Sequence, residues 1–487
     1  MTRTRDAVAS GIAWGSIARI VQVAAQFAAT AALARLLAPT DFGVVSMAAV
    51  FLAMANALAD FGVRSYVIHR PSLDQTEIET AKAVSLILGF GVFTAAALAA
   101  WPLAWFFREP RLAPVVVVQA LVYIVTSAGA VPSALLIRRL GFRRMALSEV
   151  AASLTYVTTA VVLAGAGVGY WSLVLGRVAS SLAGLLVVAH RAGSMMPRSP
   201  SVERMGSMAR FGGAVTGTGI LTQVDENFDN IVVGRFLGAE LLGVYAVGYN
   251  VAALPQRYLA YLVAGVANPV VARAEPAALS AAIQKYARYQ VLGPGAVAVG
   301  LSIMAPEVTE ILLGSRWAEA APLIRLMGLS TAMLALGTVI GGSLVSRGAV
   351  KPLFAFHAAK LAATVLGVLA GLRFGMVGVA GGFLVATSAS VLLGLRHVEA
   401  RLRVSGVLRA CFGPGAVVAA AALAAWASRS IALAADAAPY VVLAGAGFTF
   451  VAVLAGAAVI AFEDVRRDLR GVRLPRFVGR LAGRSGP

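Results

Sequence analysis

Apolar stretches about as long as a membrane is thick recur along this chain, and they limit what it can fold into. A bilayer core of about 30 Å takes roughly 20 apolar residues in a helix that rises about 1.5 Å per residue. The stretches are 12–34, 42–62, 83–106, 113–136, 147–168, 171–190, 211–233, 241–263, 290–313, 322–346, 353–372, 376–395, 410–429 and 440–462. We therefore predict an all-α polytopic membrane protein with about fourteen transmembrane helices.

The composition excludes a water-soluble fold. Hydrophobic residues make up 59% of the 487 residues and charged residues only 13%, against roughly 25% charged residues in soluble domains. The single cysteine, Cys411, excludes an intrachain disulfide framework, and the four scattered histidines show no ligand spacing for zinc or iron. We therefore expect neither a metal nor a cofactor.

The net charge of +19 would suggest nucleic acid as the partner of a soluble protein, but the distribution of Lys and Arg favours membrane orientation instead. One alternating set of loops, together with the tail, holds 29 of the 41 Lys and Arg residues. The other set holds seven, which are Arg35, Arg108, Arg111, Arg235, Arg316, Arg373 and Arg429. Because cytoplasmic loops carry the excess of basic residues, we predict that both termini are cytoplasmic. The basic tail is expected to contact anionic lipid heads rather than nucleic acid.

An internal repeat predicts two related lobes. The segment ARLLAPTDFGVVSMA from Ala34 aligns with GRFLGAELLGVYAVG from Gly234, pairing Gly43 with Gly243. Each segment follows the first helix of a six-helix set, so the sets would be related by an axis along the membrane normal. We predict an N-terminal lobe over 1–200, a C-terminal lobe over 201–400, a final helix pair over 401–465 and a basic tail over 466–487. Chance similarity between short apolar turns is the alternative.

Polar side chains inside four predicted spans indicate a hydrophilic cavity. A charged side chain at a helix centre costs about 2.5–3.5 kcal/mol, so such residues usually face a cavity or a partner. At about 100° per residue, Arg19, Gln22 and Gln26 share one helix face. The predicted cavity residues are Arg19, Gln22, Gln26, Asn56, Asp60, Tyr249, Asn250, Gln256 and Arg257. Alternatively, Arg19 pairs with Asp60 or Glu226 and only locks helices together.

The span 211–233 is the most polar of the fourteen and carries three acids. These cannot all stay ionised cheaply in a low dielectric, which is typical of proton or sodium coupling. The predicted ion-coupling residues are Asp225, Glu226, Asp229 and Asn230. Two alternatives are that the acids sit in interfacial water and that Asp229 is structural. His357 and Lys360 share a helical face and are candidates for a second site.

Four stretches of the chain carry a family resemblance. They are ARLLAPTDFGV from Ala34, VPSALLIRRLGFRR from Val131, GVGYWSLV from Gly167 and FDNIVVGRFLGAELLGVYAVGYNVAALP from Phe228. In these stretches the chain resembles the Wzx-type polysaccharide flippases of the multidrug, oligosaccharidyl-lipid and polysaccharide flippase superfamily. The later helices match only in hydrophobicity.

The resemblance implies a bacterial inner-membrane transporter with two six-helix lobes and a central cavity. Its implied substrate is an undecaprenyl-diphosphate-linked oligosaccharide, moved from the cytoplasmic to the periplasmic leaflet by alternating access coupled to an ion gradient. The product would feed surface polysaccharide synthesis, whether exopolysaccharide, capsule or O-antigen. Membrane lipids and polysaccharide-assembly proteins such as a polymerase are the implied partners. In family terms Arg19 is the cavity arginine, and Asp229 with Asn230 belongs to the acidic-amide cluster.

Two alternatives to a flippase follow from the same residues. A small-molecule or drug exporter of the same superfamily would favour an acidic, aromatic cavity for cations, whereas Arg19 and Arg257 favour an anion. A membrane enzyme of polysaccharide assembly would need a catalytic site, and no loop is long enough to supply a soluble catalytic domain. The expectation is therefore a transporter and not an enzyme.

Overall fold

The computed structural model of the chain describes residues 2–60, 62–70, 72–190 and 195–462, and within these ranges it contains helices and no strand. The first half holds α1 (Thr2–Leu36), α2 (Pro39–Asp60), α3 (Val63–His69), α4 (Gln75–Phe107), α5 (Leu112–Arg138), α6 (Phe142–Gly165), α7 (Trp171–Ala189) and α8 (Val202–Ala252). The second half holds α9 (Tyr261–Arg273), α10 (Pro276–Gln290), α11 (Ala296–Ile303), α12 (Ala305–Val308), α13 (Ala320–Ser346), α14 (Val350–Gly371), α15 (Gly375–Leu402), α16 (Val407–Ala434) and α17 (Pro439–Ala461). Short π and 3₁₀ segments, η1 (Gln256–Ala260), η2 (Val291–Gly295), η3 (Thr309–Leu313), η4 (Ser315–Trp317) and η5 (Leu372–Phe374), join some of them.

The prediction of an all-α, multi-pass membrane architecture is confirmed. In the described residues nine helices are long and apolar enough to cross a membrane, and the bent pair Pro276–Ile303 and Ala305–Leu313 would make ten. Two of the nine hold two predicted spans each, because Gln223–Ala252 is broken at Gly238 and Lys351–Leu402 contains η5. The first two predicted spans fall on α1 and α2, whose apolar parts are shorter. Within the described residues, each predicted span therefore lies mostly on helical chain.

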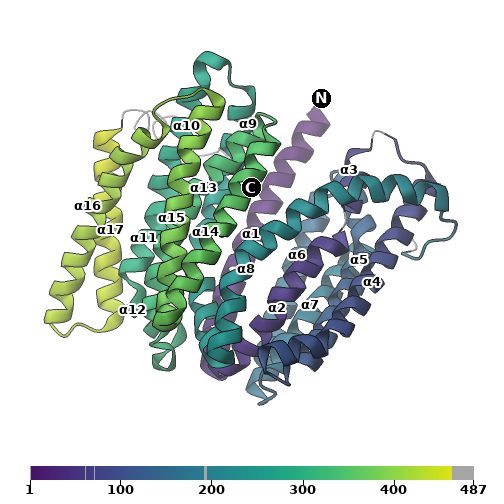
Figure 1. Ribbon diagram of the computed structural model, residues 1–487, viewed down its shortest axis with the longest axis horizontal. Helices are drawn as coiled ribbons and strands as arrows, with labels where there is room; N and C mark the ends of the chain where they lie inside the picture. Colours follow the sequence, from purple (N-terminus) through teal and green to yellow (C-terminus); the bar gives the residue numbers. More distant parts are fainter. Residues whose placement is uncertain (1, 61, 71, 191–194, 463–487) are drawn as a thin grey trace, which may run out of the picture. The chain divides into compact units, whose positions relative to one another are not determined.

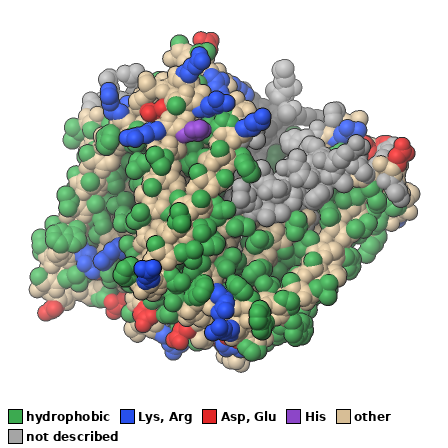
Figure 2. All heavy atoms as spheres, in the orientation of Figure 1, with side chains coloured by type: hydrophobic (Ala, Val, Ile, Leu, Met, Phe, Trp, Pro, Cys, Tyr) green, Lys and Arg blue, Asp and Glu red, His purple; other side chains and the backbone are tan. Residues whose placement is uncertain are grey.

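The chain forms two compact units. Unit 1 comprises Met1–Asn250, Leu312–Leu323 and Phe354–Ala386, and unit 2 comprises Val251–Ile311, Ile324–Leu353 and Thr387–Pro487. These groupings do not test the predicted lobe boundaries, which stay a prediction. On the face shown in Figure 2, hydrophobic side chains cover the length of the helices, and most charged side chains lie near helix ends.

In unit 1, α4 to α7 lie side by side, and α6 also packs against α1 (Figure 1). The start of α4 is fixed by a capping box, in which Asp74 accepts a hydrogen bond from the Glu77 backbone and Glu77 accepts one from the Asp74 backbone. This arrangement satisfies two amide groups that a helix start otherwise leaves unpaired. The same helix ends at Phe107 and is followed by the C-cap residue Arg108, whose backbone adopts the left-handed conformation.

A sharp break in α8 folds the repeat segment back on itself. Gly238 has φ 88° and ψ 179°, a conformation that only glycine adopts without strain. Beyond the break, α8 crosses α2 so closely that a side chain on Gly43 would overlap the carbonyl of Ala239. A side chain on Gly243 would likewise overlap the carbonyl of Pro39. The contact is reciprocal between positions that the predicted repeat pairs.

An aromatic side chain also contacts each repeat segment at its first residue. The Phe107 ring at the end of α4 lies against Gly234, which leaves no room for a side chain there. At Ala34, which the predicted repeat pairs with Gly234, Trp317 of η4 donates an indole hydrogen bond of 2.8 Å to the backbone carbonyl. Trp317 is fully buried and packs edge-on against Phe42 with ring centroids 5.3 Å apart. These contacts place residues 312–323 in unit 1 although they are distant in sequence.

The α14–α15 hairpin brings its own backbone together through glycines. Gly367 lies against Gly382 and Gly371 against Gly378, backbone to backbone. Small residues four apart allow such close approach between helices in a membrane, where apolar side chains have no advantage over lipid.

Unit 2 is held by polar contacts as well as apolar packing. Glu307 accepts hydrogen bonds of 2.8 Å from the Arg429 guanidinium, which links α12 to α16. Gln290 donates to Thr338 at 2.7 Å and to the carbonyl of Ala260 at 3.0 Å, at the point where α10 changes to the π segment η2.

Candidate functional site

A buried ion pair joins α8 to α14 in unit 1. Lys360 Nζ donates to Asp225 Oδ2, and Thr364 Oγ1 donates to Asp225 Oδ1 at 3.3 Å. Asp225 is 3% exposed and Lys360 8%, so both charges are withdrawn from solvent. A buried charge is tolerated only when a counter-charge and further hydrogen bonds accompany it, and this pair has both. Lys360 and Thr364 lie one helical turn apart, which lets one face of α14 bind both oxygens of the carboxylate.

A second buried carboxylate lies one turn further along α8. Asp229 is 1% exposed, and its Oδ2 accepts a 2.7 Å hydrogen bond from the Tyr245 hydroxyl. Its Oδ1 accepts from the Asn230 backbone at 2.8 Å and from the Asn230 side chain at 3.3 Å. Tyr245 lies on the other side of Gly238, so the break in α8 creates this contact. The donors on Asp229 are all neutral, whereas Asp225 has a lysine.

His357 extends this cluster on α14. It is half-buried, one turn before Lys360, and contacts the Phe356 ring with centroids 5.5 Å apart. Its Nδ1 is buried without a hydrogen-bond partner among the described residues. The predicted second site at His357 and Lys360 therefore lies together with Asp225, in one cluster.

A separate polar group lies on α1. Arg19 donates to Gln22 Oε1 at 3.3 Å, and Gln22 donates to Glu149 Oε2 of α6 at 3.1 Å. Arg19 and Glu149 are exposed, so this group faces open space rather than the packed core of unit 1. In the adjacent turns the Arg143 guanidinium lies over the Trp14 ring, 5.2 Å from its centroid.

The other predicted residues are more scattered. Gln26 is exposed on α1, Glu226 and Asn250 are exposed on α8, and Tyr249 is half-buried there. In unit 2, Gln256 is half-buried and Arg257 exposed, both on η1. The side chains of Asn56 and Asp60 lie outside the described residues.

The burial of the acids also bears on the alternatives. Asp225 and Asp229 are buried within the protein. The alternative that the acids of the span 211–233 contact interfacial water was therefore wrong for these two residues. Two partners were missed by the sequence analysis, Thr364 and Glu149. The signal for Glu149 was present, since it is the sole acid in the span 147–168, whereas only the three-dimensional contact reveals Thr364. Within the part of the chain that the structure describes, no group of three His, Cys, Asp or Glu residues could hold a metal ion.

Comparison with known proteins identifies the family. Residues 32–322 match the profile of a family described as "Polysaccharide biosynthesis protein", more than half of the chain. The chain belongs to this polysaccharide biosynthesis family. The match begins after Arg19 and ends before Lys360, so the family profile covers the α8 acids but neither of these two cations.

Two curated proteins support this membership. The family member is 26% identical over 402 residues to the lipopolysaccharide biosynthesis protein WzxC of Escherichia coli (strain K12), covering 80% of each chain. It is also 26% identical over 351 residues to the succinoglycan biosynthesis transport protein ExoT of Rhizobium meliloti (strain 1021), covering 69% of this chain and 68% of ExoT. The predicted Wzx-type resemblance is therefore confirmed.

A solved structure confirms the fold. The family member superimposes on the lipid II flippase MurJ in an inward closed conformation with a TM-score of 0.75 at 12% identity, covering 93% of this chain and 99% of MurJ. At that identity the similarity establishes the fold alone.

Proposed function

We propose that this protein is a flippase that moves undecaprenyl-diphosphate-linked oligosaccharides from the cytoplasmic to the periplasmic leaflet for surface polysaccharide synthesis. One relative is named as a transport protein for succinoglycan biosynthesis, and a protein of the same fold is named as a lipid II flippase. The observation that carries the proposal in this chain is the exposed Arg19 on α1, held beside Gln22 and Glu149.

The residue chemistry suits this substrate. A diphosphate carries about two negative charges, and guanidinium groups bind phosphate oxygens through paired hydrogen bonds. Arg19 and Arg257 are assigned that role, and the amides of Gln22, Gln26 and Asn250 are assigned to sugar hydroxyls. The polyprenyl tail stays in lipid, so the protein needs to shield only the head group, whose transfer through hydrocarbon is otherwise prohibitive.

Orientation and partners belong to the same proposal. The excess of basic residues in one set of loops supports an inner-membrane protein with both termini in the cytoplasm. A reporter fused after Arg484 is then active only on the cytoplasmic side. Translocation breaks no covalent bond of the substrate, so the protein acts as a transporter and not as an enzyme. A polymerase of the same assembly pathway receives the translocated unit.

Ion coupling is assigned to the buried cluster on α8. Asp225 already has a cation in Lys360, whereas Asp229 is held by neutral donors only. A carboxylate held by neutral donors gains more from binding a proton or sodium ion than one that is paired with a lysine, because neutral donors compensate its charge less. Glu226 and Asn230 complete the proposed coupling group.

The proposal is tested with Arg19→Ala in a strain that lacks the native gene. We expect loss of surface polysaccharide and accumulation of lipid-linked units on the cytoplasmic face, with Arg19→Lys partly active. Arg373→Ala, an exposed arginine in η5, is the matched control and is expected to export normally. Normal export by a well-inserted Arg19→Ala variant would reject the assigned role of this residue, and export of drugs but not lipid-linked sugars would reject the flippase.

A further inference from the structure

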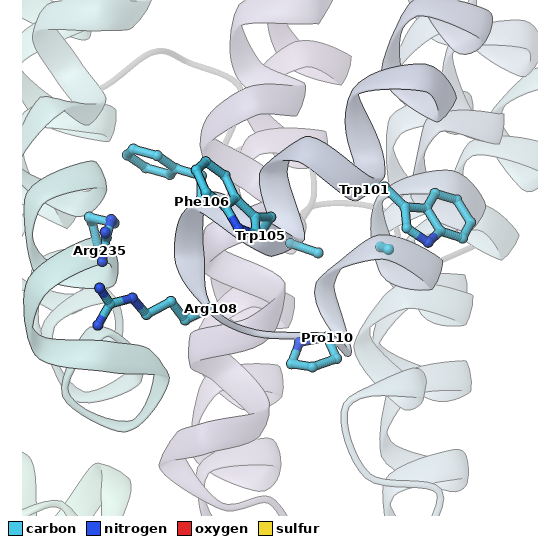
Figure 3. Close-up of a pocket in the computed structure, with 8 residues that line it drawn as sticks. Trp101, Trp105, Phe106, Arg108, Pro110 and Arg235 are labelled. Carbon is cyan, nitrogen blue, oxygen red and sulfur yellow. The ribbon is translucent and has the colours of Figure 1, made fainter.

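A pocket of about 580 Å³ lies where α4 ends and α5 begins, beside the break in α8. Figure 3 shows its lining, which includes Trp101, Trp105, Phe106, Arg108, Pro110 and Arg235. All of these residues belong to unit 1. The volume lies within the range of small-molecule sites, roughly 300–1,000 Å³.

Two arginines converge on this pocket. In Figure 3 the Arg108 side chain extends toward Arg235, and among the eight described residues that line the pocket none is acidic. Both arginines come from the set of loops that holds only seven basic residues, the side where arginine is least expected. Like charges brought together repel one another unless an anion lies between them.

Glu109, the acid next to Arg108 in sequence, is paired with another arginine. Glu109 accepts hydrogen bonds of 2.8 Å from both Nε and Nη2 of Arg111, and one of 3.2 Å from the Arg111 backbone. These contacts with the Arg111 guanidinium hold the pKa of Glu109 below its ordinary value. Glu109 therefore stays ionised and paired with Arg111, so its charge does not compensate Arg108 or Arg235.

Arg108 has an uncommon backbone conformation, which Leu140, Arg403 and Asp436 share. Its φ of 57° lies in the left-handed region, where the end of a helix usually has glycine. A residue with a side chain costs roughly 1 kcal/mol or more there.

The aromatic residues indicate what surrounds the ligand. Trp105 is 85% exposed and Trp101 67%, so neither contributes to the packed core. Tryptophan is enriched at the level of the lipid head groups, where its ring is apolar and its N–H is polar. The Arg235 guanidinium lies 5.5 Å from the Phe106 centroid, which orients it at the edge of the pocket.

We infer that this pocket binds the phosphate of a membrane lipid between Arg108 and Arg235, with the lipid chains beside Trp101 and Trp105. The shared chemistry is a phosphate or diphosphate on an apolar anchor, which a glycerophospholipid and a polyprenyl diphosphate both supply. The site is separate from the α8 carboxylates and from Arg19, and it does not depend on the proposed transport.

The test measures lipid binding by the full chain in detergent. Melting temperature is followed during titration with dioleoyl phosphatidylglycerol, dioleoyl phosphatidylcholine, farnesyl diphosphate or inorganic diphosphate. We expect phosphatidylglycerol or farnesyl diphosphate to stabilise the protein more than phosphatidylcholine. In Arg108→Gln/Arg235→Gln, the concentration for half-maximal stabilisation should rise roughly tenfold or more, because two charge-assisted bonds are lost. Arg373→Gln is the matched control and should bind as the wild type does.

The outcomes separate the possible sources of the phosphate. Stronger stabilisation by farnesyl diphosphate assigns the site to polyprenyl diphosphates, and stronger stabilisation by phosphatidylglycerol assigns it to bilayer lipid. A lipid titration that is unchanged in the double Gln variant would overturn the site. The site would also be overturned if inorganic diphosphate stabilised the protein as much as the anionic lipids do, because the pocket would then bind free anions. Should the double Gln variant fold poorly, Arg108→Lys/Arg235→Lys keeps the charges, and its anionic-lipid binding must exceed its phosphatidylcholine binding.

Discussion

Gly43 on α2 and Gly243 on α8 face each other across a backbone contact, and each would overlap a carbonyl of the opposite segment if it carried a side chain. The same two glycines are paired by the internal repeat of the sequence. The contact therefore links the repeat, which is a pattern of residues, to a symmetric crossing of two helices. In a membrane, where small residues permit close helix packing, such a crossing stabilises the fold.

We predict that Gly43→Ala and Gly243→Ala each lower the stability of the protein. The added methyl group must separate α2 from α8, and overpacking of this kind costs about 1–3 kcal/mol. Thermal unfolding in detergent measures the effect. Gly91→Ala in α4 is the control, since a side chain there meets nothing within 4 Å and its melting temperature should be unchanged or slightly higher. Equal melting temperatures for all three variants would mean that the crossing tolerates separation.

The Asp225–Lys360 pair predicts strongly non-additive substitutions. Asp225→Asn or Lys360→Met alone leaves one buried charge without its counter-charge, which costs about 3–5 kcal/mol. The double variant Asp225→Asn/Lys360→Met removes both charges and should recover most of that loss. Melting temperatures of the four proteins form a double-mutant cycle. Additive losses would show that the two side chains act independently.

The Tyr245 hydroxyl is expected to hold Asp229 in place across the break in α8. Tyr245→Phe removes the 2.7 Å hydrogen bond and leaves Oδ2 without that donor, at a cost of roughly 1–3 kcal/mol. If Asp229 couples transport to an ion gradient, Asp229→Asn also changes the dependence of flipping on proton or sodium gradients in proteoliposomes. A Tyr245→Phe protein as stable as the wild type would contradict the first expectation.

The turn between α4 and α5 is predicted to be sensitive to acid. The hydrogen bonds from Arg111 lower the pKa of Glu109 from its ordinary value of 4.5, so the ionised form stabilises the folded state. This stabilisation is present above pH 4.5 and is lost as the pH falls through the lowered pKa.

The measurement compares the wild type with Glu109→Gln from neutral pH to about pH 3. Their difference in melting temperature should be constant above the ordinary pKa of Glu109 and should shrink below it. Arg111→Gln removes the partner and should abolish the same pH dependence. A difference that does not vary with pH would show that the pair contributes nothing to folding.

Much of the fold follows from hydrophobic length and charge. The fourteen apolar stretches predicted helices in the right places because a membrane imposes one length and one secondary structure on each span. Only the structure showed where helical chain is broken between two predicted spans. Gly238 and η5 divide continuous helical chain, and no local pattern states how sharply a glycine will bend it.

For the polar residues too, the sequence predicted one part and the structure decided the other. Sequence alone marked Arg19, Asp225, Asp229 and Lys360 as costly charges inside apolar spans, because their transfer energy depends only on residue type and surroundings. Which charged side chains form pairs depended on how the helices pack. Lys360 lies on α14, far from Asp225 in sequence, and its pairing with that carboxylate, like the convergence of Arg108 and Arg235, arises only when the helices assemble. Transfer energy is a local property, whereas partnership depends on contacts between distant segments, so only the tertiary structure decided it.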